Sequence, residues 1–340
     1  MQFLIQLFLL VLLLITQFTY AEKTQYKSQI EQLITTAHKE DNFNGTVLVA
    51  KHDEIIFHKS YGFADQYKKV PLTIEHRLSP GSIAKEFTTT IMMQLKIKGK
   101  LKYEDKISKY LPYLPAWANN VSIENILTHT SGMPKVKWHS NITTTDIQKQ
   151  LTAIKTPEFK PDEGYLYTNL NVVLRALIIE KIINEPFHIY AKNVLFKHAE
   201  MTNTFNKTTV NSDTKLMAFG DYPTAISGLT IYTTAFDLYE WEKALWENKL
   251  IDREHLIRMI TKQGLSGNTH RAYFDFGTFI TDDKQRLIQL MHDGSHPSHH
   301  AIKYNNFDNE VIIILMSSDG RKTTLYELKT SISNILTEQI

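Results

Sequence analysis

The sequence predicts an α+β fold, an α/β sandwich in which one antiparallel sheet is built from both ends of the chain. Helices from the two ends flank the sheet, and a helical part is inserted between its two halves. Two β-like runs near the start predict the first half of the sheet, at residues 46–50 and 55–58. Four more runs near the end predict its second half, at residues 273–280, 286–292, 301–306 and 311–316. Between them the apolar residues recur with helical spacing, so we expect layers of helix and sheet packed around one core.

The length of the chain, 340 residues with 42% hydrophobic residues, is enough for a sizeable core. We expect residues 1–21 to be a signal peptide and residues 22–340 to be a single domain. The sheet subdomain covers about 22–90 and 225–340, and the helical subdomain covers about 91–224. A binding site is expected in the cleft where the two subdomains meet.

The first 21 residues predict export. The run from Phe3 to Ile15 is apolar apart from Gln6, and it is followed by small-residue cleavage positions ending at Ala21. A secreted or periplasmic protein is expected. No Lys or Arg precedes the apolar run, so an uncleaved membrane anchor stays open as an alternative. No other membrane segment is expected.

The composition excludes several classes of function. The formal net charge is only +2, which does not predict a polyanionic partner such as nucleic acid. The chain has no cysteine, which rules out disulfides, a cysteine nucleophile and thiolate metal sites. The oligomeric state is left open.

The elements follow in order along the chain. A polar amphipathic segment at 23–40 precedes a hairpin formed by the runs 46–50 and 55–58. A helix follows Pro80, and a short helix at 123–127 is closed by the loop 128–134, which reads THTSGMP. Helical spacing returns at 171–183 and at 235–245, the latter capped by Thr234, and a last helix begins at Thr323.

The start of the helix after Pro80 carries a candidate nucleophile. Ser79 suits the N-cap and Pro80 the first helical position, so Ser82 lies in the first turn, with Lys85 three residues on and on the same side. A serine hydroxyl needs a base, and a lysine can be that base if burial lowers its pKa. The same spacing at Ser212 and Lys215 shows that a capping serine beside a solvated lysine is the plain alternative.

Two further motifs follow in order. Tyr167 and Asn169 form a Tyr-x-Asn element just before a predicted helix, where a loop could project both side chains into a cleft. The sequence His292, Asp293, Gly294, Ser295 ends a predicted strand. Each motif also has an ordinary structural interpretation, because a buried tyrosine is usually packing and a histidine at a strand end is usually a hydrogen-bonded surface group.

Taken together, the motifs resemble the serine β-lactamase and penicillin-binding-protein superfamily, with the greatest likeness to its class C branch, the D-alanyl-D-alanine carboxypeptidases and the family VIII esterases. The resemblance rests on Ser82 to Lys85, the THTSGMP loop, Tyr167 to Asn169 after residues 161–164, residues 226–229 ahead of 234–238, and the strand-end HDG. It covers about residues 43–318 in the expected order.

The resemblance implies a β-lactamase/transpeptidase-like fold and a serine hydrolase that works through an acyl-enzyme without a metal or organic cofactor. The partner that it implies is a small acyl substrate or a cell-wall peptide. Ser82 would attack the carbonyl, Lys85 would accept its proton or hold Tyr167 as phenolate, and Tyr167 would protonate the leaving group. Asn169 would orient Lys85 and the substrate. The backbone N–H groups of Ser82 and Ser295 would hold the oxyanion, with Gly294 allowing close approach and His292 in a position usually held by Lys or His.

Asp293 departs from the pattern, because penicillin-recognising members usually have a hydroxyl at this position. A carboxylate that points into the cleft would repel β-lactams and D-alanyl-D-alanine peptides, which favours other esters or amides as substrates. A β-lactamase or carboxypeptidase remains the alternative. A cell-wall binding protein without turnover and a metal site at His292, His296, His299 and His300 are further alternatives, although Pro297 breaks any helix that would align the last histidines.

Overall fold

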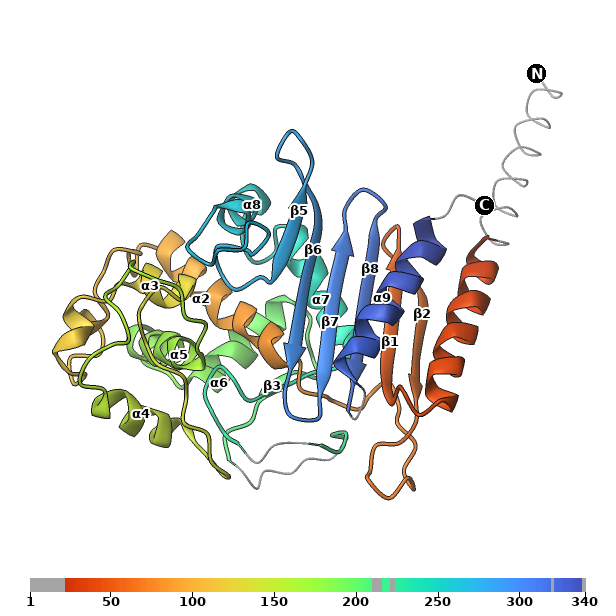
Figure 1. Cartoon of the computed structure of the whole chain (residues 1–340), viewed down its shortest axis with the longest axis horizontal. Helices are drawn as coiled ribbons and strands as arrows, with labels where there is room; N and C mark the ends of the chain where they lie inside the picture. The colour runs from red at the N-terminus through yellow and green to blue at the C-terminus, as the bar shows by residue number, and fades with distance from the viewer. Residues whose placement is uncertain (1–21, 210–215, 221–223, 319–320, 338–340) are drawn as a thin grey trace.

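The computed structural model describes residues 22–209, 216–220, 224–318 and 321–337. Within them a six-stranded antiparallel sheet has the strand order β2-β1-β8-β7-β6-β5 (Figure 1). The strands are β1 (Gly45–Lys51), β2 (Glu54–Tyr61), β5 (Thr278–Thr281), β6 (Leu287–Ser295), β7 (His300–Asn306) and β8 (Val311–Ser317). The pairing of β1 with β8 joins the two ends of the chain, so the predicted α+β fold is confirmed.

Helices cover both faces of the sheet (Figure 1). The alternation of side chains along a strand sends Ile313 and Leu315 of β8 to one face, where they meet residues 22–39 and α9 (Lys322–Thr337). Ile314 and Met316 face the other side, where α2 (Lys85–Ile97) and α7 (Ala235–Trp246) pack. Every second residue of this central strand is therefore buried on each side, which explains its continuous apolar sequence.

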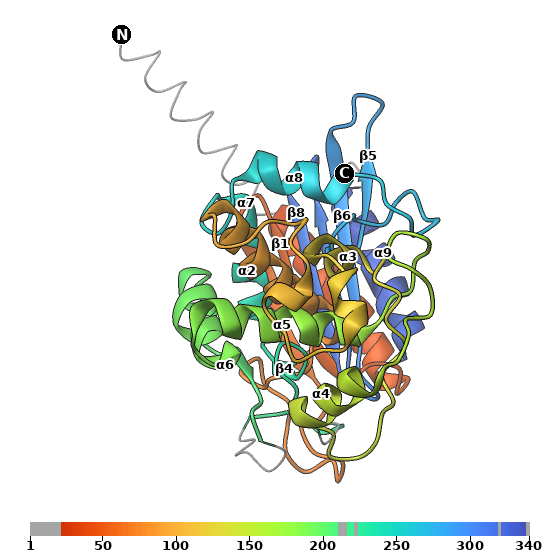
Figure 2. The same ribbon diagram turned by 90° about the vertical axis from the view of Figure 1, so that its left-hand side faces the viewer.

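The inserted helices lie beside the second face (Figure 2). They are α3 (Ile123–Thr128), α4 (Thr144–Ala153), α5 (Asn169–Ile183) and α6 (Phe187–Tyr190), and a helical segment of π type, Ala191–Phe196, continues α6. The strands β3 (Phe205–Asn206) and β4 (Ile231–Tyr232) pair with each other, and α8 (Arg253–Thr261) follows α7. The buried side chains of these helices form one cluster with side chains of the sheet. The hydrophobic core is therefore continuous across the predicted boundary between the two subdomains.

Two of the differences from the sequence prediction concern the strand expected at 273–280 and the helix α4. The expected strand at 273–280 shrinks to Thr278–Thr281, because Gly277 adopts a φ of +85° and its carbonyl accepts the N–H of Ala272 in a turn. The helix α4 was not predicted from the sequence, since only Ile147 and Leu151 on it are buried and the apolar spacing is weak. Both differences are local and leave the order of the sheet unchanged.

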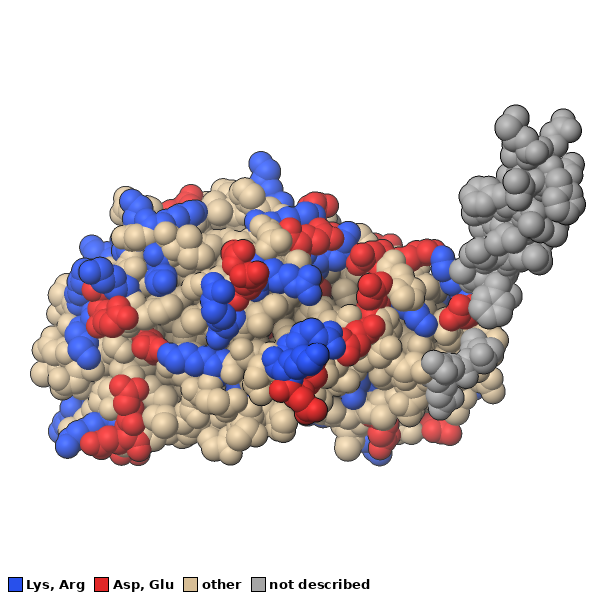
Figure 3. Space-filling model, turned by 90° about the horizontal axis from the view of Figure 1, so that it is seen from above, with Lys and Arg blue, Asp and Glu red and all other residues tan. Residues whose placement is uncertain are grey.

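The predicted signal peptide at 1–21 lies outside the described residues. None of the helices in the described part of the chain has the length and apolarity that a bilayer crossing needs. On the face seen from above, acidic and basic side chains are interspersed, and neither sign forms a large patch (Figure 3). This surface gives no indication of a polyanionic partner.

Candidate active site

Ser82 lies at the start of the helix that the sequence predicted. A 3₁₀ turn, Gly81–Ala84, leads directly into α2, and Pro80 occupies the N-cap position in place of the first helical position. Ser79 accepts the Gly81 N–H through its hydroxyl, at 3.2 Å. Ser82 therefore stands in the first turn of a continuous helical segment, with its backbone N–H among those that have no partner within the helix.

Lys85 meets Ser82 across one turn. Its Nζ lies 3.1 Å from Oγ of Ser82, and the residue is only 3% exposed. Burial lowers the pKa of Lys85 from 10.5 to about 8, against the opposing influence of Asp275. No ion pair joins Lys85 to a carboxylate within the described ranges, so the amine is placed to take the serine proton in its neutral form.

Tyr167 completes the group around the serine. The Nζ of Lys85 lies 5.0 Å from the centre of the Tyr167 ring, and the Ser82 hydroxyl is near enough to the phenol to lower its pKa. Burial, followed by the charge of Asp275, raises the pKa of Tyr167 well above its ordinary value. The free protein therefore holds a neutral phenol beside a lysine whose pKa is lowered, an arrangement that favours Lys85 over Tyr167 as the base.

The loop at 128–134 holds the segment that carries Tyr167. The carbonyl of His129 accepts the N–H of Leu166, and the carbonyl of Pro134 accepts the hydroxyl of Thr168 at 2.6 Å. Lys135 also donates to the carbonyl of Tyr167. The sequence singled out this loop as a motif without giving it a task, and the structure shows that it fixes the backbone on both sides of the phenol.

His129 stands at the centre of this loop with its ring against Tyr167. It closes α3 in the left-handed conformation, with a φ of +57°, and the two ring centres are 4.4 Å apart. Its Nδ1 accepts the backbone N–H of Thr168 at 3.2 Å, so its Nε2 carries the hydrogen and donates to Asp275 at 3.0 Å. Burial lowers the pKa of His129 despite the nearby carboxylate, which leaves the ring neutral.

Asp275 and Arg175 are two site residues that the sequence did not reveal. Arg175, on α5, is fully buried and donates from Nη2 to Oδ2 of Asp275 at 2.6 Å. Burial alone would raise the pKa of Asp275, but His129 and Arg175 outweigh it and hold the pKa far below its ordinary value. Asp275 is thus a buried permanent anion behind Tyr167 and Lys85. One signal in the sequence could have revealed them: each is a charged residue within a predicted apolar element. Arg175 lies in the predicted helix at 171–183, and Asp275 lies in the predicted strand at 273–280.

The end of β6 lies directly against Ser82. A β-carbon added to Gly294 would lie 2.7 Å from the Ser82 nitrogen, and one added to Gly81 would lie 2.3 Å from the Ser295 nitrogen. The strand β5 pairs with β6 only as far as Met291, so residues 292–295 have no strand on that side among those described. The N–H groups of Ser82 and Ser295 therefore lie close together at an open strand edge, as an oxyanion site requires.

Asn169 lines the same cleft as Ser82 and Lys85. Its Oδ1 is buried without a hydrogen-bond partner in the described structure, and no hydrogen bond joins it to Lys85. The expected contact between Asn169 and Lys85 is therefore not formed here. The other lining residues include Ser82, Lys85, Trp138, Ile226, Ser295 and His296.

His292 faces away from this cleft. Its Nδ1 lies 2.6 Å from Oε1 of Glu86, the residue after Lys85, and both side chains are buried. Oε2 of Glu86 accepts from Trp241 at 2.7 Å and pairs with Lys303 at 3.0 Å. Burial raises the pKa of Glu86, but Lys303 and His292 more than offset this and lower it overall. The structure thus places His292 behind the nucleophile helix, where it ties β6 to α2 and does not line the cleft.

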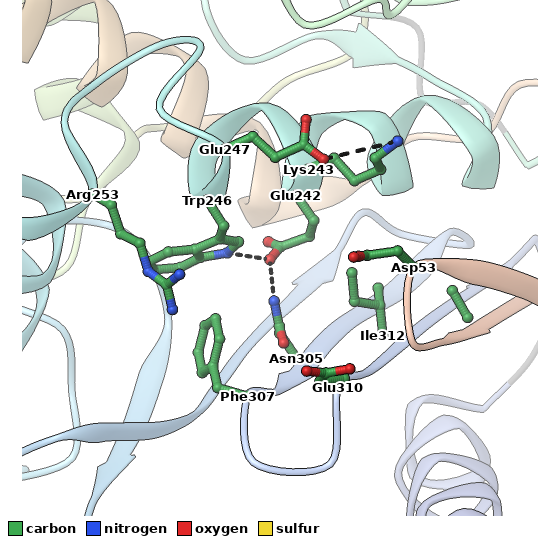
Figure 4. A pocket seen from close by; sticks show the side chains of 11 residues that line it. Asp53, Glu242, Lys243, Trp246, Glu247, Arg253, Asn305, Phe307, Glu310 and Ile312 are labelled. Carbon is green, nitrogen blue, oxygen red and sulfur yellow. Dashed lines mark hydrogen bonds and ion pairs between the residues drawn. The ribbon is translucent and has the colours of Figure 1, made fainter.

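The same network reaches a second hollow at the opposite end of the sheet (Figure 4). Glu242 also pairs with Lys303, and it accepts from Trp246 at 2.7 Å and from Asn305 at 3.1 Å at the floor of this hollow. The acceptor atoms of Glu242 are therefore all engaged by protein donors. This hollow stands apart from Ser82, since Asn305 lies at the far end of β7 from His300, the partner of Ser295.

Asp293 points to the other face of the sheet. Its carboxylate forms an ion pair with Lys322 of α9, and although burial raises its pKa, Lys322 lowers the pKa below its ordinary value. Gly294 faces Ser82, so the alternation of a strand sends Asp293 to the opposite side. The argument that Asp293 repels anionic substrates required an inward side chain, and this premise is wrong.

Three of the four histidines considered as metal ligands have separate side-chain partners. His299 accepts the Ser79 N–H at 2.9 Å and donates to the Phe219 carbonyl at 2.7 Å, while His300 lies 3.1 Å from Oγ of Ser295. His292 is bonded to Glu86, as described above. Within the described ranges, no three His, Asp or Glu side chains gather in a way that could hold a metal ion.

Comparison with known proteins places this geometry in a family. The profile of the Beta-lactamase family matches residues 30–330. A curated relative, Penicillin-binding protein 4* of Bacillus subtilis (strain 168), is 25% identical over 335 residues, which cover 88% of this chain and 74% of the relative.

Two solved structures have the same fold. The penicillin binding protein from Bacillus halodurans superposes with a TM-score of 0.78 at 20% identity, covering 89% of this chain and 98% of the other. A class C beta-lactamase superposes with a TM-score of 0.76 at 18% identity, covering 94% and 97%. The predicted resemblance and the predicted serine hydrolase are confirmed: the chain belongs to the Beta-lactamase family.

Proposed function

We propose that the protein hydrolyses ester or amide substrates through an acyl-enzyme on Ser82. The observation that carries the proposal is the 3.1 Å contact between the buried amine of Lys85 and Oγ of Ser82 at the start of a helix. A cap-region serine beside a solvated lysine would leave the lysine exposed, whereas Lys85 is buried and its pKa is lowered to about 8. Nucleophile and base are therefore within hydrogen-bond reach.

The proposed reaction has two halves. Lys85 accepts the proton of Ser82 as Oγ bonds to the substrate carbonyl carbon, and the N–H groups of Ser82 and Ser295 hold the oxyanion. Tyr167 donates its proton to the leaving group as the acyl-enzyme forms, and the lysine proton then passes to the tyrosine. In the second half water attacks the ester carbonyl and gives up a proton to the same pair. The pair passes this proton to Oγ of Ser82 as the bond between Oγ and the acyl carbon breaks, which releases the acid and free Ser82.

Substrates with a carboxylate near the leaving group form a second candidate class. Lys135 and Arg271 approach the Tyr167 ring, with charged groups 5.9 Å and 5.7 Å from its centre. Asp293 does not oppose them, because it is paired with Lys322 on the other face. These cations favour an anion at the leaving-group side, as in a penicillin or a D-alanyl-D-alanine peptide.

Steady-state kinetics test both candidates. We would measure kcat/KM for a neutral p-nitrophenyl ester, a penicillin and a D-alanyl-D-alanine peptide with wild type, Ser82→Ala, Lys135→Gln and Arg271→Gln. Loss of all turnover in Ser82→Ala supports the proposal, and unchanged turnover contradicts it. A loss in the two cation variants that is confined to anionic substrates supports the second class, and an equal loss on the neutral ester counts against it.

We also propose that the protein is exported and cleaved after Ala21. The apolar run from Phe3 to Ile15 supports this proposal. The N-terminal residue of the protein recovered from expressing cells tests it. Glu22 at the N-terminus is the expected result, and a membrane-bound protein that retains Met1 would support the anchor instead.

A further inference from the structure

The pair Lys85 and Tyr167 is held from behind by three buried residues that the proposed reaction does not use. His129 is 2% exposed and lies against the Tyr167 ring, Asp275 accepts from His129, and Arg175 pairs with Asp275. These residues come from the end of α3, the turn before β5 and the interior of α5. None of them lines the cleft that holds Ser82.

We propose that Arg175, Asp275 and His129 form a positioning relay, in which the buried Arg175–Asp275 ion pair anchors His129, His129 holds Tyr167 in place, and the two fixed charges of the pair act on the charge of Lys85. The inference rests on the proposed function, since it assigns how the catalytic pair is oriented and charged. The three are positioning residues, because they act through Lys85 and Tyr167 and do not touch the reacting atoms.

The holding part of the relay follows from hydrogen bonds. Nδ1 of His129 accepts from the backbone N–H of Thr168, the residue next to Tyr167, and lies 3.0 Å from the amide nitrogen of Asn171 one turn further on. Nε2 of the same ring donates to both carboxylate oxygens of Asp275 at 3.0 Å. A ring fixed at both nitrogens cannot rotate, so the face against Tyr167 is fixed as well.

The charge part follows from burial. Arg175 donates from Nε and Nη2 to the carbonyl of Ile126, at 3.0 Å and 2.7 Å, and from Nη1 to Thr89 at 3.0 Å. Its fork is therefore immobile, and Asp275 cannot leave the site without abandoning a buried arginine. A fixed carboxylate and a fixed guanidinium act on Lys85 with opposite signs: the first favours its charged form and the second opposes it.

The charged and titratable groups around the relay come from six parts of the chain. They are Lys85 on α2, His129 after α3, Tyr165 and Tyr167 before α5, Arg175 on α5, Arg271 and Asp275 before β5, and Asp293 on β6. Of these, Asp275 has the largest influence of any charge on Lys85 and on Tyr167. Its removal is therefore the most informative change.

The test compares two charge variants by the pH dependence of kcat/KM for the neutral ester. The acidic limb of this profile reports the deprotonation of Lys85 in the free enzyme. Asp275→Asn should move the limb to lower pH and Arg175→Gln should move it to higher pH, each by about one pH unit. Structural damage alone lowers activity at every pH and does not shift the limb in opposite directions. The role of these charges in setting the charge state of Lys85 would be overturned by either of two results. The acidic limbs of both variants could coincide with that of wild type, or both limbs could move in the same direction.

A second pair of variants tests the holding role and leaves the ion pair between Arg175 and Asp275 intact. His129→Leu removes the hydrogen bonds to Thr168, Asn171 and Asp275, and His129→Gln keeps a donor toward Asp275. We expect His129→Leu to lower kcat about 100-fold with KM changed little, because misplacement costs rate more than binding, and we expect His129→Gln to recover part of the loss. A kcat of His129→Leu within about threefold of wild type would overturn the holding role, since a positioning contact should cost more.

Ser82→Ala is included to separate this inference from the proposed function. If Ser82→Ala retains turnover, the proposed function fails. If Ser82 is required but the limbs and the kcat of the His129 variants match wild type, the relay alone fails. Neither His129 variant leaves an unpaired charge in the interior. The two variants therefore test the relay even where Asp275→Asn or Arg175→Gln does not fold.

Discussion

Gly294 and Ser82 are in such close backbone contact that a β-carbon at position 294 would lie 2.7 Å from the Ser82 nitrogen and 1.9 Å from the Pro80 carbonyl oxygen. The contact brings the end of β6 onto the turn that carries the nucleophile. It thereby places the N–H groups of Ser82 and Ser295 side by side. The geometry of the proposed oxyanion site depends on this one approach.

Gly294→Ala should separate these two segments and lower kcat/KM by about 100-fold to 1,000-fold, the range found when an oxyanion donor is lost. The melting temperature should fall as well, because the neighbours of the new methyl group are backbone atoms that cannot move aside. Kinetics on the neutral ester and thermal unfolding check both effects. Wild-type kcat/KM in this variant would show that the oxyanion is not held between Ser82 and Ser295.

Lys85→Met should abolish turnover and stabilise the fold. Lys85 has a pKa of about 8 when folded and 10.5 as the ordinary value, so the unfolded chain binds the proton more tightly. Burying this lysine costs about 3 kcal/mol at pH 7, from the linkage between pKa and stability. The cost is fully present below pH 8 and disappears as the pH rises through 10.5.

Denaturant unfolding at several pH values checks the Lys85 prediction. The gain in unfolding free energy of Lys85→Met over wild type should be largest near pH 7 and should shrink above pH 8. Thr88→Val, on the same helix and buried but without a charge, serves as the control for packing changes. A gain that is constant with pH would mean that Lys85 is not buried in its costly charged form.

Tyr167→Phe should lower kcat by about 100-fold to 10,000-fold, the usual contribution of a positioned proton donor. The ring stays in contact with His129, so the fold and the melting temperature should change little. Since the pKa of Tyr167 is raised, the loss should be greatest for substrates with poor leaving groups such as amides, which need the proton. An equal loss for an amide and for an activated p-nitrophenyl ester would contradict the role as proton donor.

Asp293→Asn should leave kcat/KM within about threefold of wild type for the neutral ester and for a penicillin, because groups outside the site rarely change it more. The side chain faces Lys322, and the half-exposed ion pair should contribute about 1 kcal/mol or less to stability. Lys322→Gln is the matched control, since it removes the same pair from the other side. A tenfold gain on the penicillin in Asp293→Asn alone would restore the idea that this carboxylate repels the substrate.

Much of the fold could be predicted from the sequence, because the strands and helices carry strong periodic patterns. The hairpin of β1 and β2 and the long helix α5 followed from alternation and from helical spacing. The run at 273–280 misled the prediction, because Phe274 and Phe276 alternate as in a strand although they are buried in a turn. Alternating apolar residues show only that every second side chain is buried. The turn at Gly277 buries Phe274 and Phe276 in the same way as a strand would.

The candidate site was predictable only where its residues stand in motifs. Ser82, Lys85 and Tyr167 carry fixed local spacings, and the structure brings them together. Asp275 and Arg175 lie 100 residues apart in the sequence without a local pattern, so only the folded chain shows their ion pair. The orientation of Asp293 was within reach, since Gly294 had to face Ser82 and its neighbour therefore had to face away.

Intact-protein mass spectrometry of wild type and Ser82→Ala tests the central claim most directly. Each protein is mixed with the short p-nitrophenyl ester and, separately, with a penicillin, and is quenched in acid at times shorter than one turnover. Our account predicts a mass increase equal to the acyl group on wild type, located on the peptide that contains Ser82 and lost as product appears. It predicts no such adduct on Ser82→Ala. Turnover by wild type without an adduct, or the same adduct on Ser82→Ala, would contradict the account.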